Sequence, residues 1–136
     1  MKRRGIQTAA VFIGMMSLAS PATAKPQTIK LISAEVNHHD TKTTSVAHDS
    51  DSIGPRVIGH DTVTCTFTGK NSARCRVIFV RPSFGTLYLS FKTSGNGSGH
   101  GTITGGTRAY SGAHGTFTYR SLNKAGSRNA VTLNLA

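Results

Sequence analysis

Short segments in which apolar and polar residues alternate are the feature that most constrains the fold of this sequence. The plainest of them, at 86–91, reads TLYLSF, so that its two leucines and its phenylalanine occupy every second position. Successive side chains of a β-strand point to opposite faces, and this spacing therefore predicts a strand with one apolar face. The 136 residues include 15 glycines and no tryptophan, a composition that disfavours a long helical bundle.

Further segments favour strands, and they lie at 28–36, 57–67, 74–80, 102–104, 113–119 and 130–135. The polar stretch 37–54 shows no 3.6-residue apolar repeat and is interpreted as a loop with at most one irregular edge strand. Short strands without a helix predict an all-β fold, either an antiparallel sandwich or an antiparallel β-barrel. A closed barrel is favoured, because the sequence offers no helix to cover the edges of an open sheet.

Residues 1–24 have the three parts of a secretory signal peptide. Lys2, Arg3 and Arg4 are followed by an apolar run at 9–18, and 22–24 reads ATA, small residues that signal peptidase accepts. The run is too short to cross the roughly 30 Å hydrocarbon core of a membrane. We therefore expect cleavage after Ala24, export to the periplasm, cell envelope or medium, and a single barrel domain at 25–136. Loss of the three basic residues lowers the formal net charge from +11 to +8.

Cys65 and Cys75 are the only cysteines, and they lie on two segments that are expected to pair as a β-hairpin around the turn sequence GKNS at 69–72. If the turn is centred near Lys70, the two residues are directly opposed. An oxidising compartment then favours a disulfide between them. A metal-binding pair and a thiol nucleophile are the alternatives.

All carboxylate side chains of the chain precede Thr62, and they are Glu35, Asp40, Asp49, Asp51 and Asp61. A mechanism that needs two carboxylates must draw both from this part. Glu35 follows the apolar face of the segment 28–36 at period two and would face the barrel interior, where burial would raise its pKa and allow it to move a proton. The alternative is that Glu35 ends its strand in solvent or beside an arginine.

The histidines are interpreted as polar loop residues rather than as metal ligands. His38 and His39 are adjacent and would point to opposite faces of an extended backbone. His38, His48 and Asp51 are the best available ligand types, but their spacing does not organise a site. We therefore expect no metal and no cofactor.

Residues 62–136 contain nine Lys and Arg and no carboxylate. Such a surface raises the local concentration of anionic partners. Specific nucleic-acid recognition is not expected, because no aromatic residues are interleaved to stack on bases. Docking on an anionic lipid or cell-surface polymer and a solvated basic face without a partner both stay open.

The segment 99–119, GHGTITGGTRAYSGAHGTFTY, resembles the T-G-G-[TS]-G-x-[YF]-x-G-x-x-G signature of the allene oxide cyclase and dirigent barrel proteins. Gly105 and Gly106 are expected to form a turn with positive φ, and Gly112 and Gly115 to let neighbouring backbones approach closely. Arg108 stands where that family usually has glycine.

Two shorter matches resemble allene oxide cyclase in particular. Glu35, Asn37 and Asp40 follow the E-x-N-x-x-D pattern at the end of that enzyme's first strand, and Gly59 with Cys65 follows a G-x5-C strand. The resemblance implies an eight-stranded antiparallel barrel, often trimeric, with an apolar cavity and with Glu35 and Asn37 at its active site. It also places His100 at an aromatic position shortly before the T-G-G turn.

Three hypotheses of function follow. The first is a small exported barrel that binds an apolar molecule through Phe67, Phe79, Leu89, Phe91, His100 and Tyr110, with Glu35 and Asn37 as the polar groups. The second is an isomerase or cyclase of an unstable epoxide-type intermediate that uses Glu35. The third is a basic barrel that docks on an anionic surface polymer.

Overall fold

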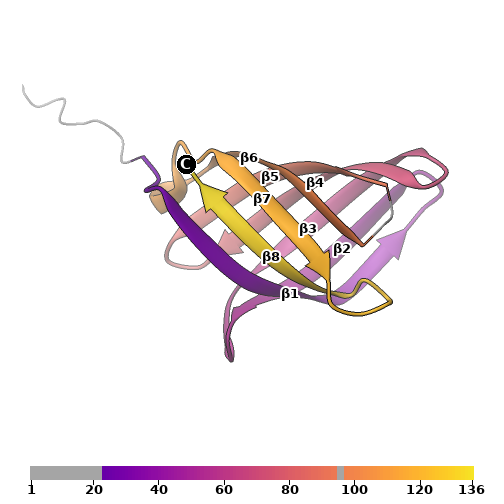
Figure 1. Ribbon diagram of the computed structural model, residues 1–136, viewed down its shortest axis with the longest axis horizontal. Helices are drawn as coiled ribbons and strands as arrows, with labels where there is room; N and C mark the ends of the chain where they lie inside the picture. Colours follow the sequence, from indigo (N-terminus) through magenta and orange to yellow (C-terminus); the bar gives the residue numbers. More distant parts are fainter. Residues whose placement is uncertain (1–22, 95–96) are drawn as a thin grey trace, which may run out of the picture.

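The computed structural model describes residues 23–94 and 97–136, which form a closed antiparallel β-barrel (Figure 1). Almost all of the expected signal peptide therefore lies outside the described residues. The strands are β1 (Gln27–Asp40), β2 (Thr44–Ile53), β3 (Arg56–Gly69), β4 (Ser72–Arg81), β5 (Gly85–Thr93), β6 (Ser98–Gly106), β7 (Gly115–Ser121) and β8 (Arg128–Leu135). This confirms the predicted all-β barrel of about eight strands. Among the described residues, no helix has the length and apolar character to cross a membrane.

Every strand pairs with its neighbour in the sequence, and β8 pairs with β1 to close the barrel. The alternation in β5 works as predicted, since Leu87 and Leu89 are buried inside while Tyr88 is exposed outside. Closure leaves no sheet edge unpaired. Because the strands alternate in direction, the β1–β2, β3–β4, β5–β6 and β7–β8 connections meet at one end of the barrel, and both described chain ends lie at the other (Figure 1).

The interpretation of 37–54 as a loop was wrong. β1 continues to Asp40 after a bulge between Glu35 and Asn37, and β2 pairs along its length with both β1 and β3. Inward positions of β2 are occupied by Ala47, Asp49 and Asp51, which line the interior. A strand whose inward residues are small or acidic has no apolar alternation, so the hydrophobic pattern could not show it. β6 also extends into the Gly/Ser segment expected to be a loop, since it begins at Ser98.

Buried side chains fill the end of the barrel that carries the described chain ends. Tyr110, in the 3-10 turn η3 (Arg108–Tyr110), is 1% exposed, and its hydroxyl accepts a hydrogen bond from Arg81 at 3.1 Å. The Arg81 guanidinium in turn lies 3.9 Å from the centre of the Phe84 ring. Further buried residues complete this plug, namely Ala24, Ile29, Leu87, Ile103, Ala113 and Leu135. We call this end the closed end.

The glycines of the T-G-G segment permit close backbone approach, but only part of their expected geometry is present. Gly112 and Gly115 have φ of +72° and +140°, and a Cβ on Gly115 would lie 2.0 Å from the Asn134 carbonyl oxygen. Gly105 and Gly106 belong to β6, and neither has the positive φ that was expected. A Cβ on Gly106 would instead meet the Tyr110 carbonyl oxygen at 2.3 Å. The left-handed residue of the turn is Arg108, with φ of +56°, at the position where the resembling family has glycine.

The structure confirms the disulfide between Cys65 and Cys75. The two residues are directly opposed in the pairing of β3 with β4, as the hairpin register predicted. The crosslink closes a short loop and restricts the unfolded chain, which the loop-entropy relation puts at about 2.5 kcal/mol of stabilisation.

Candidate functional site

The barrel interior holds a cavity of about 280 Å³, which opens at the end opposite the plug. We call this end the mouth. One part of the wall is apolar and is formed by Val63, Val77, Phe79, Leu89, Phe91 and Phe117. The other part is polar and is formed by Ser33, Glu35, Asp49, Asp51, Asp61 and Asn129. The cavity therefore has two chemically different sides.

Three aromatic rings form the apolar side near the mouth. Phe91 on β5 lies edge-on to Phe117 and Tyr119 on β7, with ring centres 5.8 and 5.1 Å away. These edge-to-face contacts hold the rings in fixed orientations. The cavity thus presents aromatic surface that does not need to reorganise before a ring-bearing molecule binds.

The polar side contains a carboxyl cluster, Asp49, Asp51 and Asp61, carried by β2 and β3. Strand register places Glu35, Asp49 and Asp61 side by side across β1, β2 and β3. The Ser33 hydroxyl lies 3.1 Å from an Asp49 oxygen and 3.2 Å from an Asp61 oxygen. One hydroxyl has one proton to donate, so both hydrogen bonds form together only if one of these two carboxyl groups is itself protonated.

Two members of the carboxyl cluster have buried oxygens without an N–H donor. Asp51 is 0% exposed, and no N–H group among the described residues donates to its carboxyl oxygens, which lie beside the Asp61 carboxyl group and the Ser33 hydroxyl. Asp61 is 6% exposed, and its Oδ1 also lacks such a donor there. Buried polar atoms are rarely left unpaired, so these three oxygens need an explanation.

Burial raises the pKa of every carboxyl group in the cluster, because an apolar surrounding disfavours the charged form. The pKa of Asp61 is raised to about 8, by burial and then by the neighbouring Asp51. The pKa of Asp49 is raised to about 7, by burial and then by the charge of Asp61. Burial also raises the pKa of Asp51 to about 6. The cluster therefore shares protons near neutral pH.

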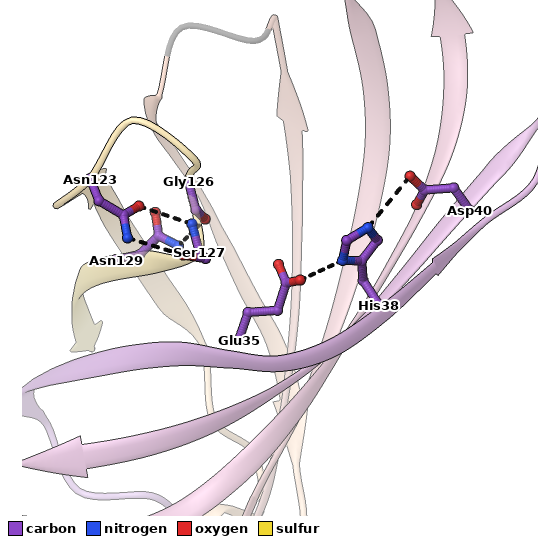
Figure 2. Close-up of polar contacts among 7 residues, drawn as sticks. All are labelled: Glu35, His38, Asp40, Asn123, Gly126, Ser127 and Asn129. Carbon is purple, nitrogen blue, oxygen red and sulfur yellow. Dashed lines mark hydrogen bonds and ion pairs between the residues drawn. The ribbon is translucent and has the colours of Figure 1, made fainter.

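Polar contacts at the mouth hold Glu35 beside the β7–β8 loop (Figure 2). Glu35 Oε2 lies 2.5 Å from His38 Nδ1, and the other ring nitrogen of His38 lies 3.9 Å from Asp40. The hydrogen bond and the charge of Glu35 raise the pKa of His38, and the charge of Asp40 adds to this. The backbone N–H of Glu35 donates to the Ser127 carbonyl at 2.8 Å. The loop is thus tied to the strand that carries the acid.

The loop at the mouth is also braced internally. The Asn123 side chain accepts a hydrogen bond from the Ser127 backbone N–H and donates one to the Ser127 hydroxyl, at 3.1 and 3.0 Å. Asn129 donates to the Gly126 carbonyl at 3.1 Å (Figure 2). Gly126, Ser127 and Asn129 all line the cavity. These bonds give the rim a defined shape on this side.

The structure brings together only some of the residues expected to form the site. Glu35, Phe79, Leu89 and Phe91 line the cavity, whereas Asn37 is exposed beyond the bulge in β1. The two disulfide cysteines also line the cavity.

The remaining expected ligand residues lie elsewhere. Phe67 is 43% exposed near the end of β3, just before a shift in the register of β3 with β4, and it is not part of the cavity wall. Tyr110 belongs to the closed end. His100 is exposed on β6, in a groove on the basic outer surface that also includes Arg74 and Lys92.

Sequence reasoning missed the carboxyl cluster, although a usable pattern was present. Asp49 and Asp51 are two residues apart, which places them on one face of a strand. Once 44–53 is assigned as a strand, both acids must lie on the same side of the sheet. The described residues include no group of three His, Cys, Asp or Glu side chains that could hold a metal ion.

The architecture and cavity define the chain as a closed antiparallel β-barrel with an internal cavity. It has the allene oxide cyclase-like barrel fold, and two solved structures show the likeness. A pyocyanin demethylase matches with a TM-score of 0.69 and 17% identity, over 81% of this chain and 100% of that one. A pterocarpan synthase dirigent protein matches with a TM-score of 0.59 and 15% identity, over 93% and 96% of the two chains. No protein-family model and no curated protein sequence matches the chain.

Proposed function

We propose that the barrel binds an apolar small molecule in its cavity. The observation that carries this proposal is the cavity of about 280 Å³ with fixed aromatic rings on one side and a small set of polar groups on the other. Small-molecule sites are typically concave and mostly apolar, with few polar groups that orient the ligand. A cavity of this size suits a molecule with one or two rings. The two similar structures are named for chemistry on other molecules, which supports a ligand in the cavity without assigning either reaction to this chain.

Filling the cavity should weaken binding of a neutral aromatic probe. We expect indole to bind with a Kd in the micromolar to millimolar range, and Val63→Phe to weaken it by at least about tenfold, because the new ring occupies the cavity. Val63 lines the cavity, whereas Ile78 on β4 is an exposed residue outside it. Ile78→Phe is therefore the matched control and should leave binding unchanged. The measurement is an NMR titration, and equal affinity in both variants would exclude the cavity as the site.

A second candidate function, an isomerase or cyclase reaction on an epoxide-type intermediate, is favoured by the position of Glu35. Its carboxyl group lines the cavity and also contacts His38, which is exposed at the mouth. This arrangement could pass a proton between a ligand and solvent. If turnover occurs, Glu35→Gln should lower kcat by about a hundredfold or more and leave ligand affinity within about threefold. A kcat unchanged by this substitution would exclude Glu35 as the acid or base.

We also propose that the protein is exported. The disulfide supports this, because such bonds persist in oxidising compartments, and so does the signal peptide expected from the sequence. The basic outer groove with Arg74, Lys92 and His100 supports docking on an anionic surface polymer as a separate property of the exterior.

A further inference from the structure

We propose that the carboxyl cluster is a subsite for a positively charged nitrogen, so that the ligand is an aromatic amine cation with N–H donors. This inference rests on the proposed function and names the class of ligand that the cavity takes. The ring would lie against the aromatic side of the cavity, and the ammonium group would lie among Asp49, Asp51 and Asp61.

The distribution of charge inside the barrel is the first argument. The chain has 16 Lys and Arg and six His, yet none of those within residues 23–94 and 97–136 lines the cavity. The cavity wall does include four carboxyl groups, those of Glu35, Asp49, Asp51 and Asp61. A buried carboxylate is costly unless it is paired, and breaking such a pair costs several kcal/mol. The described part of the barrel supplies no cation to this cluster, so a bound cation is the partner that would complete it.

The oxygens without an N–H donor are the second argument. Both oxygens of the fully buried Asp51 and one oxygen of Asp61 have no N–H donor as a partner among the described residues, and the Asp51 and Asp61 carboxyl groups can bond to each other only while one of them is protonated. Once all three carboxyl groups are ionised they only accept hydrogen bonds, so in that state the partner that they need is a donor from outside the cluster. An alkylammonium group supplies both a positive charge and N–H donors. A purely apolar molecule offers none, and an anion would add to the repulsion.

The geometry of the barrel fits a molecule with a ring and an ammonium group at opposite ends. The cluster is on β2 and β3, whereas the aromatic side is on β5 and β7. In a closed barrel with this sequential order of eight strands, β7 lies across the interior from β3, and β5 is separated from β3 by β4. A ligand that spans the cavity would thus contact Phe91 and Phe117 at one end and the cluster at the other.

Binding of a cation is expected to release protons, because it favours the ionised carboxyl groups. From β1 the cluster faces Ser33 and Glu35, while β4 contributes Phe79 and β8 contributes Asn129, which are uncharged. Among the described residues, the only other titratable group at this wall is therefore another acid, Glu35. Affinity for the amine should fall as the pH is lowered, whereas affinity for a neutral ring should not change.

The test compares three probes by isothermal titration calorimetry at a pH of about 8.5, where the cluster is largely ionised. Phenethylamine carries an ammonium group, propylbenzene is its neutral counterpart of similar shape, and 3-phenylpropanoate carries a negative charge. We expect phenethylamine to bind at least about tenfold more tightly than propylbenzene, and 3-phenylpropanoate to bind most weakly. Lowering the pH to about 5 should remove the preference for the amine.

Substitutions within the cluster locate the effect. In Asp51→Asn and in Asp61→Asn, the ratio of phenethylamine to propylbenzene affinity should fall by at least about fivefold, since each removes a buried negative charge. Asp40→Asn is the matched control, because this exposed acid at the mouth lies outside the cavity wall and should leave the ratio unchanged. Near-ultraviolet circular dichroism confirms that each variant is folded.

The outcomes separate the two proposals. If propylbenzene binds as tightly as phenethylamine, the proposed function stands and the cation subsite is overturned. If the amine preference survives both cluster substitutions, the subsite is overturned as well. If no probe binds, the proposed function fails and the subsite fails with it.

Discussion

Raising the pH from about 4.5 to about 8.5 is expected to lower the free energy of unfolding by at least about 3 kcal/mol. The three cluster carboxyl groups have pKa values of about 7, 6 and 8 in the folded protein and near 3.8 when unfolded. The folded state thus binds more protons than the unfolded state in this range. Stability from these groups is fully present below the unfolded pKa and is lost as the pH rises through the folded values. A shift of one pKa unit corresponds to about 1.4 kcal/mol, so the combined shifts of the three carboxyl groups are large enough to account for the expected loss of stability.

Urea unfolding at a series of pH values measures this loss, and Asp61→Asn provides the control. Asp61 has the highest pKa of the three carboxyl groups, and asparagine keeps its shape without its charge. The variant should therefore be more stable than the parent protein at high pH and should show a weaker pH dependence. The raised pKa of His38 contributes in the same direction. Stability that increases with pH over this interval would contradict the assignment of raised carboxyl pKa values.

Gly115→Ala is expected to destabilise the barrel by about 3 kcal/mol, since it adds a methyl group where two backbones touch. Gly115 begins β7 with φ of +140°, a conformation that favours glycine, and its Cβ would lie 2.0 Å from the Asn134 carbonyl oxygen. Neither the strained backbone nor the clash can be relieved without moving β8 away from β7. Chemical unfolding at constant pH measures the effect.

Gly105→Ala tests whether this cost comes from the contact rather than from the loss of any glycine in the segment. A Cβ on Gly105 would have its nearest neighbour, a ring carbon of Tyr88, at 3.7 Å, which is ordinary contact. Its effect should stay below about 1 kcal/mol. Equal losses in the two variants would mean that the close approach at Gly115 does not limit stability.

The fold was predictable from the sequence because most strands carry the pattern that burial requires. The alternation in β5 correctly predicted that Leu89 points inside. The hairpin register around Lys70 correctly predicted that Cys65 lies opposite Cys75. The pattern fails where the interior is polar. β2 directs two aspartates inward, and a rule that searches for apolar residues at every second position reads such a strand as a loop.

The candidate site was only partly predictable for a related reason. Alternation assigns a side chain to a face of a strand, but it does not say how far along the strand the cavity extends. Phe67 continues the apolar face of β3 and yet lies near the strand's end, and Tyr110 is buried at the closed end. Which inward residues line a cavity depends on where the plug ends, and this depends on packing between residues distant in the sequence.

The plug built around Tyr110, Arg81 and Phe84 closes one end of the described barrel, so that the cavity opens at the mouth and not at both ends. A molecule that enters at the mouth must leave by the same opening, so a second molecule can bind only after the first has dissociated. Exchange between two ligands should then follow the first-order departure of the resident, at a rate independent of the competitor's concentration. Such a protein is suited to retaining or presenting one molecule at a time and not to passing molecules through its axis.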